Sequence, residues 1–258
     1  YTMVQQVIEG SLDEADCKVV PGTLHHLIGA FHNLREARNR RGTLNLNISE
    51  AKIQFDKTGQ PESIAQKHQE EAHQLIEEFM IAANICAAET LEQAGESCVY
   101  RIHDQPDPEK IDSLRELTDV LSLPFAKGQV MTPSKFNELL TKVKDTDAET
   151  AVNEAILRCQ SRAVYAPDNI GHYGLGLTRY AHFTSPIRRY ADLLVHRGLI
   201  SVMTGKKGGR SAASREKLVE ICAAISQTEQ TAAKAERRAT ARLAAKILSN
   251  KTITEFEV

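Results

Sequence analysis

The sequence lacks the features of several common protein classes. Its 258 residues contain no tryptophan, and aromatic residues make up only 5%. No apolar run is long enough to span a membrane, and no signal-peptide pattern opens the chain. The net charge of −2 does not by itself predict binding to nucleic acid. A hydrophobic content of 41% over this length is ordinary for a globular protein with a sizeable core.

The cysteines are few, odd in number and scattered, and no two form a Cys-x-x-Cys pair. This pattern excludes a disulfide framework and a zinc finger, and it predicts reduced thiols in a cytoplasmic protein. The cysteines are Cys17, Cys86, Cys98, Cys159 and Cys222.

Acidic residues do not gather in a pattern that predicts a metal site. Asp104 and Asp107 are close enough in sequence to form a small one. They also stand in a proline-rich segment that leads into a helix, where aspartates are typical turn and capping residues. We therefore assign no metal ligand in this chain.

The periodicity of apolar residues predicts a predominantly helical α+β fold. Pro21 and Thr23 open the first helix, and Gly42 ends it. Further helices are expected at about 68–93, 108–121, 132–143, 147–161, 186–204 and 214–249. Short strands are expected at 44–48, 51–55, 63–65, 163–165 and 173–177.

One run, Thr184 to Ala191, combines a helix start with two arginines. Thr184 or Ser185 is a suitable N-cap, and Pro186 fits the first helical position. Arg188 and Arg189 then fall in the first turn, where the helix dipole disfavours cations. A phosphate bound there would resolve the conflict, because backbone N–H groups and arginine forks both favour it. Alternatively, Asp192 or another acceptor satisfies the arginines structurally.

A second polar group interrupts the apolar helix expected at 68–93. Glu77 and Asn84 are seven residues apart and share a face, while Glu78 lies about a quarter turn away. Carboxylates in apolar surroundings are costly unless they are paired. Either they bind an arginine on a neighbouring helix, or they serve a ligand. We expect Arg188 to lie close to Glu77 or Glu78.

The chain resembles the RNB-domain exoribonucleases of the ribonuclease II/ribonuclease R family, and the ribonuclease R branch fits best. The motif with the highest specificity is Tyr180–Leu199, YAHFTSPIRRYADLLVHRGL. In chain order it is preceded by Arg40–Gly42, Leu75–Asn84, Tyr100–Pro108 and His172–Leu175, each of which matches a family motif.

The resemblance implies a Mg²⁺-dependent 3′→5′ exoribonuclease that releases nucleoside 5′-monophosphates from single-stranded RNA. The family's metal-binding aspartates lie near the start of the RNB domain, and no such cluster is found here. Residues 1–250 are therefore expected to be the C-terminal two-thirds of that domain, inactive alone, and residues 251–258 to begin a linker to an OB-fold domain.

The same resemblance implies roles for individual residues. Arg188 would bind the phosphate next to the scissile bond and act in catalysis. The positions expected to contact RNA are Glu77, Glu78, Asn84, His182, Ser185, Arg189, Tyr190 and Glu236.

Two other functions remain open. The chain could be a non-catalytic RNA-binding module, or a helical structural or interaction domain whose arginines are structural. No membrane partner and no preference for DNA is expected, and the sequence leaves the oligomeric state open.

Overall fold

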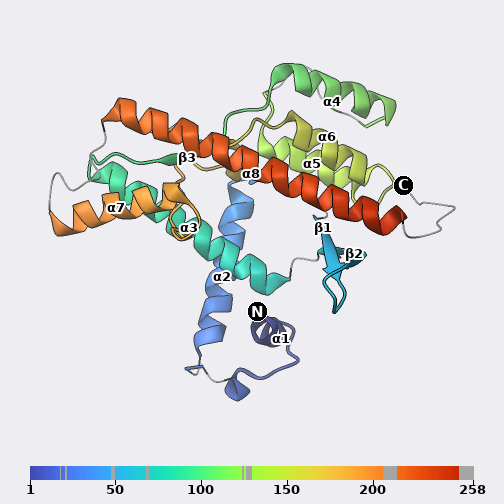
Figure 1. Ribbon diagram of the computed structural model, residues 1–258, viewed down its shortest axis with the longest axis horizontal. Coiled ribbons are helices and arrows are strands. Elements are labelled where there is room, and N and C mark those ends of the chain that lie inside the picture. Colours follow the sequence, from blue (N-terminus) through green and yellow to red (C-terminus); the bar gives the residue numbers. More distant parts are fainter. Residues whose placement is uncertain are drawn as a thin grey trace. The chain divides into compact units, whose positions relative to one another are not determined.

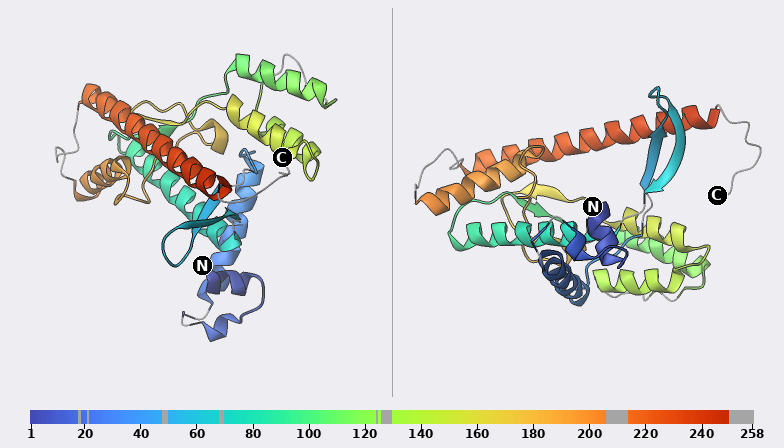
Figure 2. Two further views of the ribbon diagram at one scale, coloured as in Figure 1. Left: turned by 45° about the vertical axis from the view of Figure 1, so that its right-hand side comes forward. Right: turned by 90° about the horizontal axis from the view of Figure 1, so that it is seen from below.

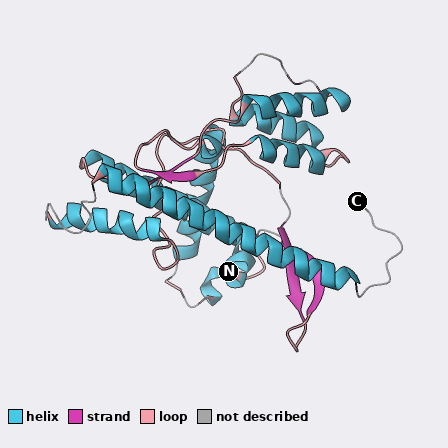
Figure 3. Cartoon of the chain, turned by 45° about the horizontal axis from the view of Figure 1, so that its top comes forward, coloured by secondary structure: helices cyan, strands magenta, loops and turns pink. Residues whose placement is uncertain are grey.

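The computed structural model describes residues 1–17, 19–20, 22–47, 50–67, 70–123, 125, 130–205 and 214–249. These residues belong to two compact units. The first comprises Tyr1–Ile48 and Glu70–Ile225, and the second comprises Ser49–Gln69 and Ser226–Val258. Helices dominate and the strands are short (Figure 3). The predicted α+β, predominantly helical class is confirmed.

The elements follow the predicted order closely. The helices are α1 (Thr2–Ile8), α2 (Thr23–Arg40), α3 (Glu71–Gln93), α4 (Pro108–Val120), α5 (Pro133–Val143), α6 (Glu149–Cys159), α7 (Tyr190–Thr204) and α8 (Arg215–Ser249), with 3₁₀ turns η1 (Glu14–Asp16) and η2 (Tyr173–Leu175). The strands are β1 (Glu50–Phe55), β2 (Pro61–Lys67), β3 (Tyr100–Ile102) and β4 (Val164–Ala166) (Figure 1).

Each strand pairs with one other strand in an antiparallel ladder. In the second unit β1 pairs with β2, with Ile53 opposite Ile64. In the first unit β3 pairs with β4, with Tyr100 opposite Ala166. Strand β3 is the first part of the segment Tyr100–Pro108, and β4 precedes the segment His172–Leu175.

Helix α2 begins where the sequence predicted, and a distant side chain caps it. The Glu14 carboxylate accepts hydrogen bonds from the backbone N–H groups of Leu24 at 2.8 Å and His25 at 3.2 Å. A carboxylate is favourable there because the first N–H groups of a helix have no partner within the helix. Gly42, in the left-handed region at φ +72°, follows the helix end. The predicted role of Pro21 lies outside the described residues.

Helices α4, α5 and α6 lie side by side around one hydrophobic cluster (Figure 2). The two proline-led helix starts, Pro108 and Pro133, fit the first helical position, where a missing N–H costs nothing. The buried members of the cluster are Ile111, Leu114, Met131, Phe136, Leu139, Val143, Val152, Ile156 and Cys159.

A second cluster joins α3, α7 and β3, and it supports the segment with the arginines. Leu91 of α3 and Val195 of α7 are almost fully buried there. Gly198 lets the two helices approach, since a Cβ at this position would lie 3.0 Å from Leu91 Cδ2. Close helix contact gives α7 a fixed position on α3.

The strand predicted at 44–48 is wrong for the described residues 44–47, because other groups take its backbone hydrogen bonds. The N–H of Leu44 donates to the Gly174 carbonyl at 2.9 Å. The N–H groups of Asn45 and Asn47 donate to the side chains of Asn137 and Asn153 at 2.9 and 2.8 Å. Residues 44–47 are thus extended but bonded to α5 and α6 rather than to a strand.

Two further elements differ from the sequence prediction. Residues 173–175 form the 3₁₀ turn η2 instead of a strand, and Gly176 ends it at φ +62°. A Cβ at Gly176 would lie 2.8 Å from the Arg41 carbonyl oxygen, so the turn packs against the end of α2. Neither β3 nor α1 was predicted from the sequence, and α1 has no buried residue.

Replacing Phe136 by alanine should destabilise the first unit by roughly 3–5 kcal/mol, because it leaves a cavity in the α4–α6 cluster. The Phe136 side chain is fully buried. The free energy of unfolding in denaturant measures the effect. Val120→Ala is the matched control, since Val120 is 82% exposed on α4. Equal stability of the two variants would contradict this packing.

Candidate functional site

Residues Tyr180–Arg189, here called the arginine loop, precede α7. The predicted helix start at Pro186 is wrong, because α7 begins at Tyr190. Arg189 is its N-cap in an extended conformation (φ −125°, ψ 117°). Residues 185–189 instead form a turn in which the Ser185 carbonyl accepts from the N–H groups of Arg188 at 3.3 Å and Arg189 at 3.1 Å. The arginines therefore lie before the helix rather than in its first turn.

The buried carboxylate of Asp192 holds this turn closed. Its Oδ1 accepts from the backbone N–H of Ser185 at 2.8 Å and from Arg189 Nη2 at 2.8 Å. Asp192 is fully buried, and the Arg189 side chain is 19% exposed. The structural alternative for the arginines therefore applies to Arg189, whose charge is neutralised inside the protein.

Asn84 and His196 hold the arginine loop at Phe183. Asn84 Oδ1 accepts from the Phe183 N–H at 2.8 Å, and Asn84 Nδ2 donates to the Tyr180 hydroxyl at 3.0 Å. His196 Nε2 donates to the Phe183 carbonyl at 2.9 Å, and the rings of His196 and Phe183 are stacked. Both ends of the buried Asn84 amide are thus occupied within the chain.

The tip of the turn faces solvent. Ile187 is fully exposed, Arg188 is exposed, and Tyr190 is 47% exposed. No ion pair of Arg188 occurs within the described part of the chain. The two neighbouring arginines thus differ in environment: Arg189 is held by Asp192, and Arg188 is available to an anion.

The glutamates of α3 pair with Arg38 of α2. Arg38 Nη1 lies 2.9 Å from Glu78 Oε1 and 3.3 Å from Glu77 Oε1. Glu78 is buried, and it shares the buried face of α3 with Asn84, whereas Glu77 is half-buried. The alternative in which an arginine on a neighbouring helix binds these carboxylates is thus confirmed for Glu78, while the closeness of Arg188 to Glu77 or Glu78 stays a prediction.

His182, within the arginine loop, is a partly buried and neutral side chain. Its Nδ1 shares a hydrogen bond of 2.8 Å with the Tyr165 hydroxyl. Burial, followed by the nearby charges of Arg189 and Arg101, lowers the pKa of His182 to about 3. An RNA contact of this residue is therefore restricted to Nε2.

His172 and His103 form a second neutral pair nearby, with ring centroids 4.9 Å apart. The Gly174 N–H donates to His103 Nδ1 at 2.9 Å, so His103 Nε2 carries the proton that it donates to the Ser161 carbonyl. Burial and the neighbouring His103 lower the pKa of His172 to about 3. This pair positions η2. Both ring nitrogens of His103 and Nδ1 of His172 already bond to backbone groups, so these atoms do not bind a ligand.

The acidic residues considered for a metal site accept local backbone hydrogen bonds, and Asp107 is the N-cap of α4. Asp107 Oδ1 accepts from the Glu109 N–H at 3.0 Å, and Asp104 Oδ1 accepts from the Gln105 N–H at 2.7 Å. Over the described ranges, no group of three or more His, Cys, Asp or Glu side chains is placed to hold a metal ion. These residues do not fit the Mg²⁺ that the resemblance implies.

The remaining predicted site residue, Glu236, is exposed on α8 in the second unit. Sequence reasoning missed Arg38 and Tyr180, which hold Glu78 and Asn84. Tyr180 opens the matched motif, so its position was a usable signal. Arg38 lies in an ordinary run of basic residues at the end of α2 and offered none.

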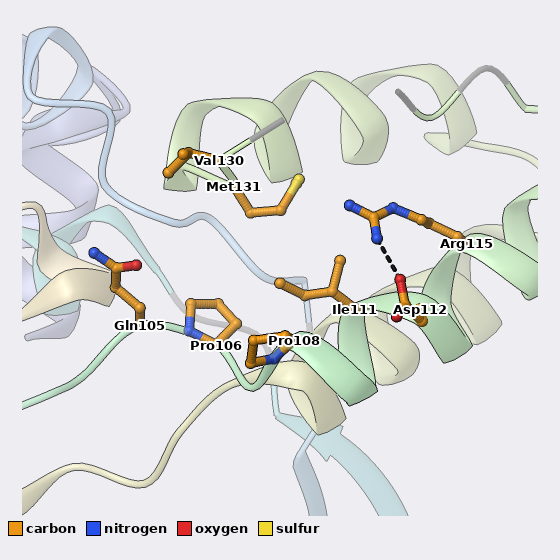
Figure 4. Close-up of a pocket in the computed structure, with 8 residues that line it drawn as sticks. All are labelled: Gln105, Pro106, Pro108, Ile111, Asp112, Arg115, Val130 and Met131. Carbon is orange, nitrogen blue, oxygen red and sulfur yellow. Dashed lines mark hydrogen bonds and ion pairs between the residues drawn. The ribbon is translucent and has the colours of Figure 1, made fainter. Parts of the chain in front are cut away.

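A separate pocket of about 240 Å³ lies beside the start of α4 (Figure 4). The ion pair between Arg115 and Asp112 borders it. None of the predicted site residues lines this pocket. Its lining residues are Gln105, Pro106, Pro108, Ile111, Asp112, Arg115, Val130 and Met131.

The sequence that contains the arginine loop matches a known protein family. The family model described as RNB domain matches residues 1–205. The chain belongs to the RNB family. The chain is 38% identical to ribonuclease R of Vibrio cholerae over 82% of its length and 36% identical to that of Escherichia coli K12 over 92%. It spans 26% and 30% of these two relatives.

A solved structure of this RNB family shares the fold. Mycoplasma genitalium RNase R in complex with ribose methylated single-stranded RNA matches 97% of this chain and 40% of its own chain. The TM-score is 0.88 at 26% sequence identity. The predicted resemblance to the ribonuclease R branch is thereby confirmed.

None of the helices described here is long and apolar enough to cross a membrane.

The neutral histidines should make the fold sensitive to mild acid. Because the folded pKa values of His172 and His182 lie below the ordinary value of 6.5, their stabilising contribution is complete above pH 6.5 and is lost as pH falls toward about 3. Each can lower stability by up to about 1.4 kcal/mol per pH unit. Unfolding in denaturant at pH 6.5 to 5 measures the slope.

The variant His182→Gln removes one titrating group and should flatten that slope, whatever its effect on stability at pH 7.5. His25→Gln is the control, since His25 is exposed on α2. If His182→Gln and His25→Gln had the same pH dependence as the parent chain, the neutral state of His182 would be refuted.

Proposed function

We propose that this chain supplies the part of a 3′→5′ exoribonuclease that holds the phosphate next to the 3′ end of single-stranded RNA. The observation that carries this proposal is the exposed Arg188 on a turn fixed from beneath by Asp192. A guanidinium that is already neutralised by a carboxylate would be a poor phosphate ligand. Arg189 is in that state, and Arg188 is not.

The comparisons support the class of substrate. The similar RNase R of Mycoplasma genitalium was solved with single-stranded RNA, and the arginine loop lies within residues matched by the RNB model. Arginine suits phosphate because its planar fork can donate two parallel hydrogen bonds. The exposed ring of Tyr190, one residue beyond Arg189, offers a stacking face for a base.

The other predicted residues take narrower roles in this proposal. Asn84 and Arg189 act from inside the fold, because their polar groups bond to Phe183, Tyr180 and Asp192. Glu77 is the more exposed of the two glutamates, at 44% against 7% for the Glu78 side chain, and is the better candidate for a contact with the terminal ribose. Ser185, His182 and Glu236 stay predictions as RNA contacts.

The proposed catalytic role of Arg188 follows from the transition state of phosphodiester hydrolysis, in which negative charge grows on the phosphoryl oxygens. An arginine fixed beside that phosphate stabilises the growing charge. The Mg²⁺ implied by the family would assist water attack, and no residue of this chain is assigned to hold it. The chain's own contribution is therefore to bind and orient the phosphate.

The 258-residue chain should bind short single-stranded RNA with an affinity that falls as salt rises. Arg188→Ala should weaken binding and reduce the slope of log K against log salt by about 0.7, the value for one lost phosphate contact on a single strand. Fluorescence anisotropy of labelled RNA at several salt concentrations measures both quantities.

Arg158→Ala is the matched control for this binding test, because it removes an exposed arginine of α6 and the same charge. An unchanged slope in Arg188→Ala, or equal losses in both variants, would leave only a structural or interaction role for this segment.

The chain on its own should release no nucleoside 5′-monophosphate from 3′-labelled single-stranded RNA, even with Mg²⁺, because its described residues offer no group of metal ligands. Thin-layer separation of the products detects a single released nucleotide. Sustained release that grows with enzyme concentration and stops on addition of a chelator would overturn this prediction.

A further inference from the structure

We propose that Asp192 is a positioning residue for Arg188, and this inference rests on the proposed function. Asp192 is fully buried, so it cannot touch RNA itself. It acts by fixing the shape of residues 185–189, so that Arg188 is presented to a phosphate while Arg189 is withdrawn.

A single oxygen of Asp192 joins the two ends of the turn. Oδ1 accepts from the Ser185 N–H, where the turn begins, and from the Arg189 guanidinium, where it ends. Both distances are 2.8 Å. The carboxylate therefore links Ser185 and Arg189, the residues at the two ends of the turn that contains Arg188.

Within the ranges that the structure describes, few other contacts stabilise the turn. Pro186 has no N–H to donate, and Ile187 buries no side-chain surface because it is fully exposed. The two bonds to the Ser185 carbonyl, at 3.1 and 3.3 Å, are longer than those to Asp192. Charge-assisted hydrogen bonds are also the stronger kind. The shape of the tip thus depends mainly on the carboxylate.

The neighbouring part of the arginine loop is held independently. Phe183 is fixed by Asn84 and His196, and neither of these contacts involves Asp192. Loss of the Asp192 charge should therefore free residues 185–189 while Phe183 and the α3–α7 contact stay in place. This separation makes a local effect measurable without loss of the fold.

Asp192→Asn is a conservative test, because the variant side chain keeps an oxygen for the Ser185 N–H. In the described part of the chain, Oδ2 of Asp192 has no hydrogen-bond partner, so an amide nitrogen in its place breaks no bond. The charge that neutralises Arg189 is lost, and the mostly buried guanidinium should then turn toward solvent and open the turn.

A double-mutant cycle on RNA binding distinguishes positioning from a general structural role. Arg188→Gln should weaken binding about tenfold, as expected for one charge-assisted contact. Asp192→Asn alone should weaken binding at least threefold, roughly, because Arg188 is no longer held. In the Arg188→Gln background, Asp192→Asn should change the affinity by less than about twofold.

The control is Asp168→Asn, which removes a carboxylate paired with Arg215 outside the arginine loop and should leave RNA affinity unchanged. Thermal unfolding of every variant reports whether the fold persists. Asp192→Glu should weaken binding as Asp192→Asn does, because the longer side chain misplaces the carboxylate oxygens. Additive losses in the cycle would overturn the positioning role. No effect of Arg188→Gln itself would overturn the proposed function instead.

Discussion

The geometry of the candidate site depends on the ion pair between the buried Asp192 and Arg189. A buried carboxylate is costly unless it is paired and hydrogen-bonded, and here one oxygen meets both a guanidinium and a backbone N–H. The pair closes the turn before α7 and removes the charge of one arginine from the surface. Of the two adjacent arginines, Arg188 remains exposed, at a defined position on the turn.

A polar network around the arginine loop gives that position its rigidity. Asn84 Nδ2 donates to the Tyr180 hydroxyl, and Asn84 Oδ1 accepts from the Phe183 N–H. The Tyr165 hydroxyl shares a hydrogen bond with Nδ1 of the neutral His182. Such a network specifies one arrangement, because moving any member leaves a buried polar group without a partner.

Most of the fold could be predicted from the sequence, because regular apolar spacing and a proline at the first helical position are clear signals of long helices. Short elements could not, since tertiary contacts decide them. Residues 44–47 alternate like a strand, yet asparagine side chains of α5 and α6 take their N–H groups. The start of α7 was misplaced for a related reason, because Asp192 reaches back to Ser185 and holds a turn where local signals favour a helix.

For the candidate site, the sequence predicted the motif around Arg188 but not the contacts that hold it. The pattern around Arg188 pointed to phosphate, and the sequence named Asp192 as a possible internal acceptor. It could not decide which arginine Asp192 would hold. The ion partner of Glu78 could not be predicted either. Arg38 is forty residues away in the sequence and contacts Glu78 only because α2 packs on α3.

The central claim is that the two adjacent arginines have different roles, with Arg188 meeting phosphate and Arg189 held inside. Nuclear magnetic resonance of the arginine side-chain Nε–H groups, during titration with a short single-stranded RNA, tests this most directly. We expect the Arg188 signal to shift with RNA while the Arg189 signal stays constant. A shift of Arg189 with an unchanged Arg188, or equal shifts of both, would contradict it.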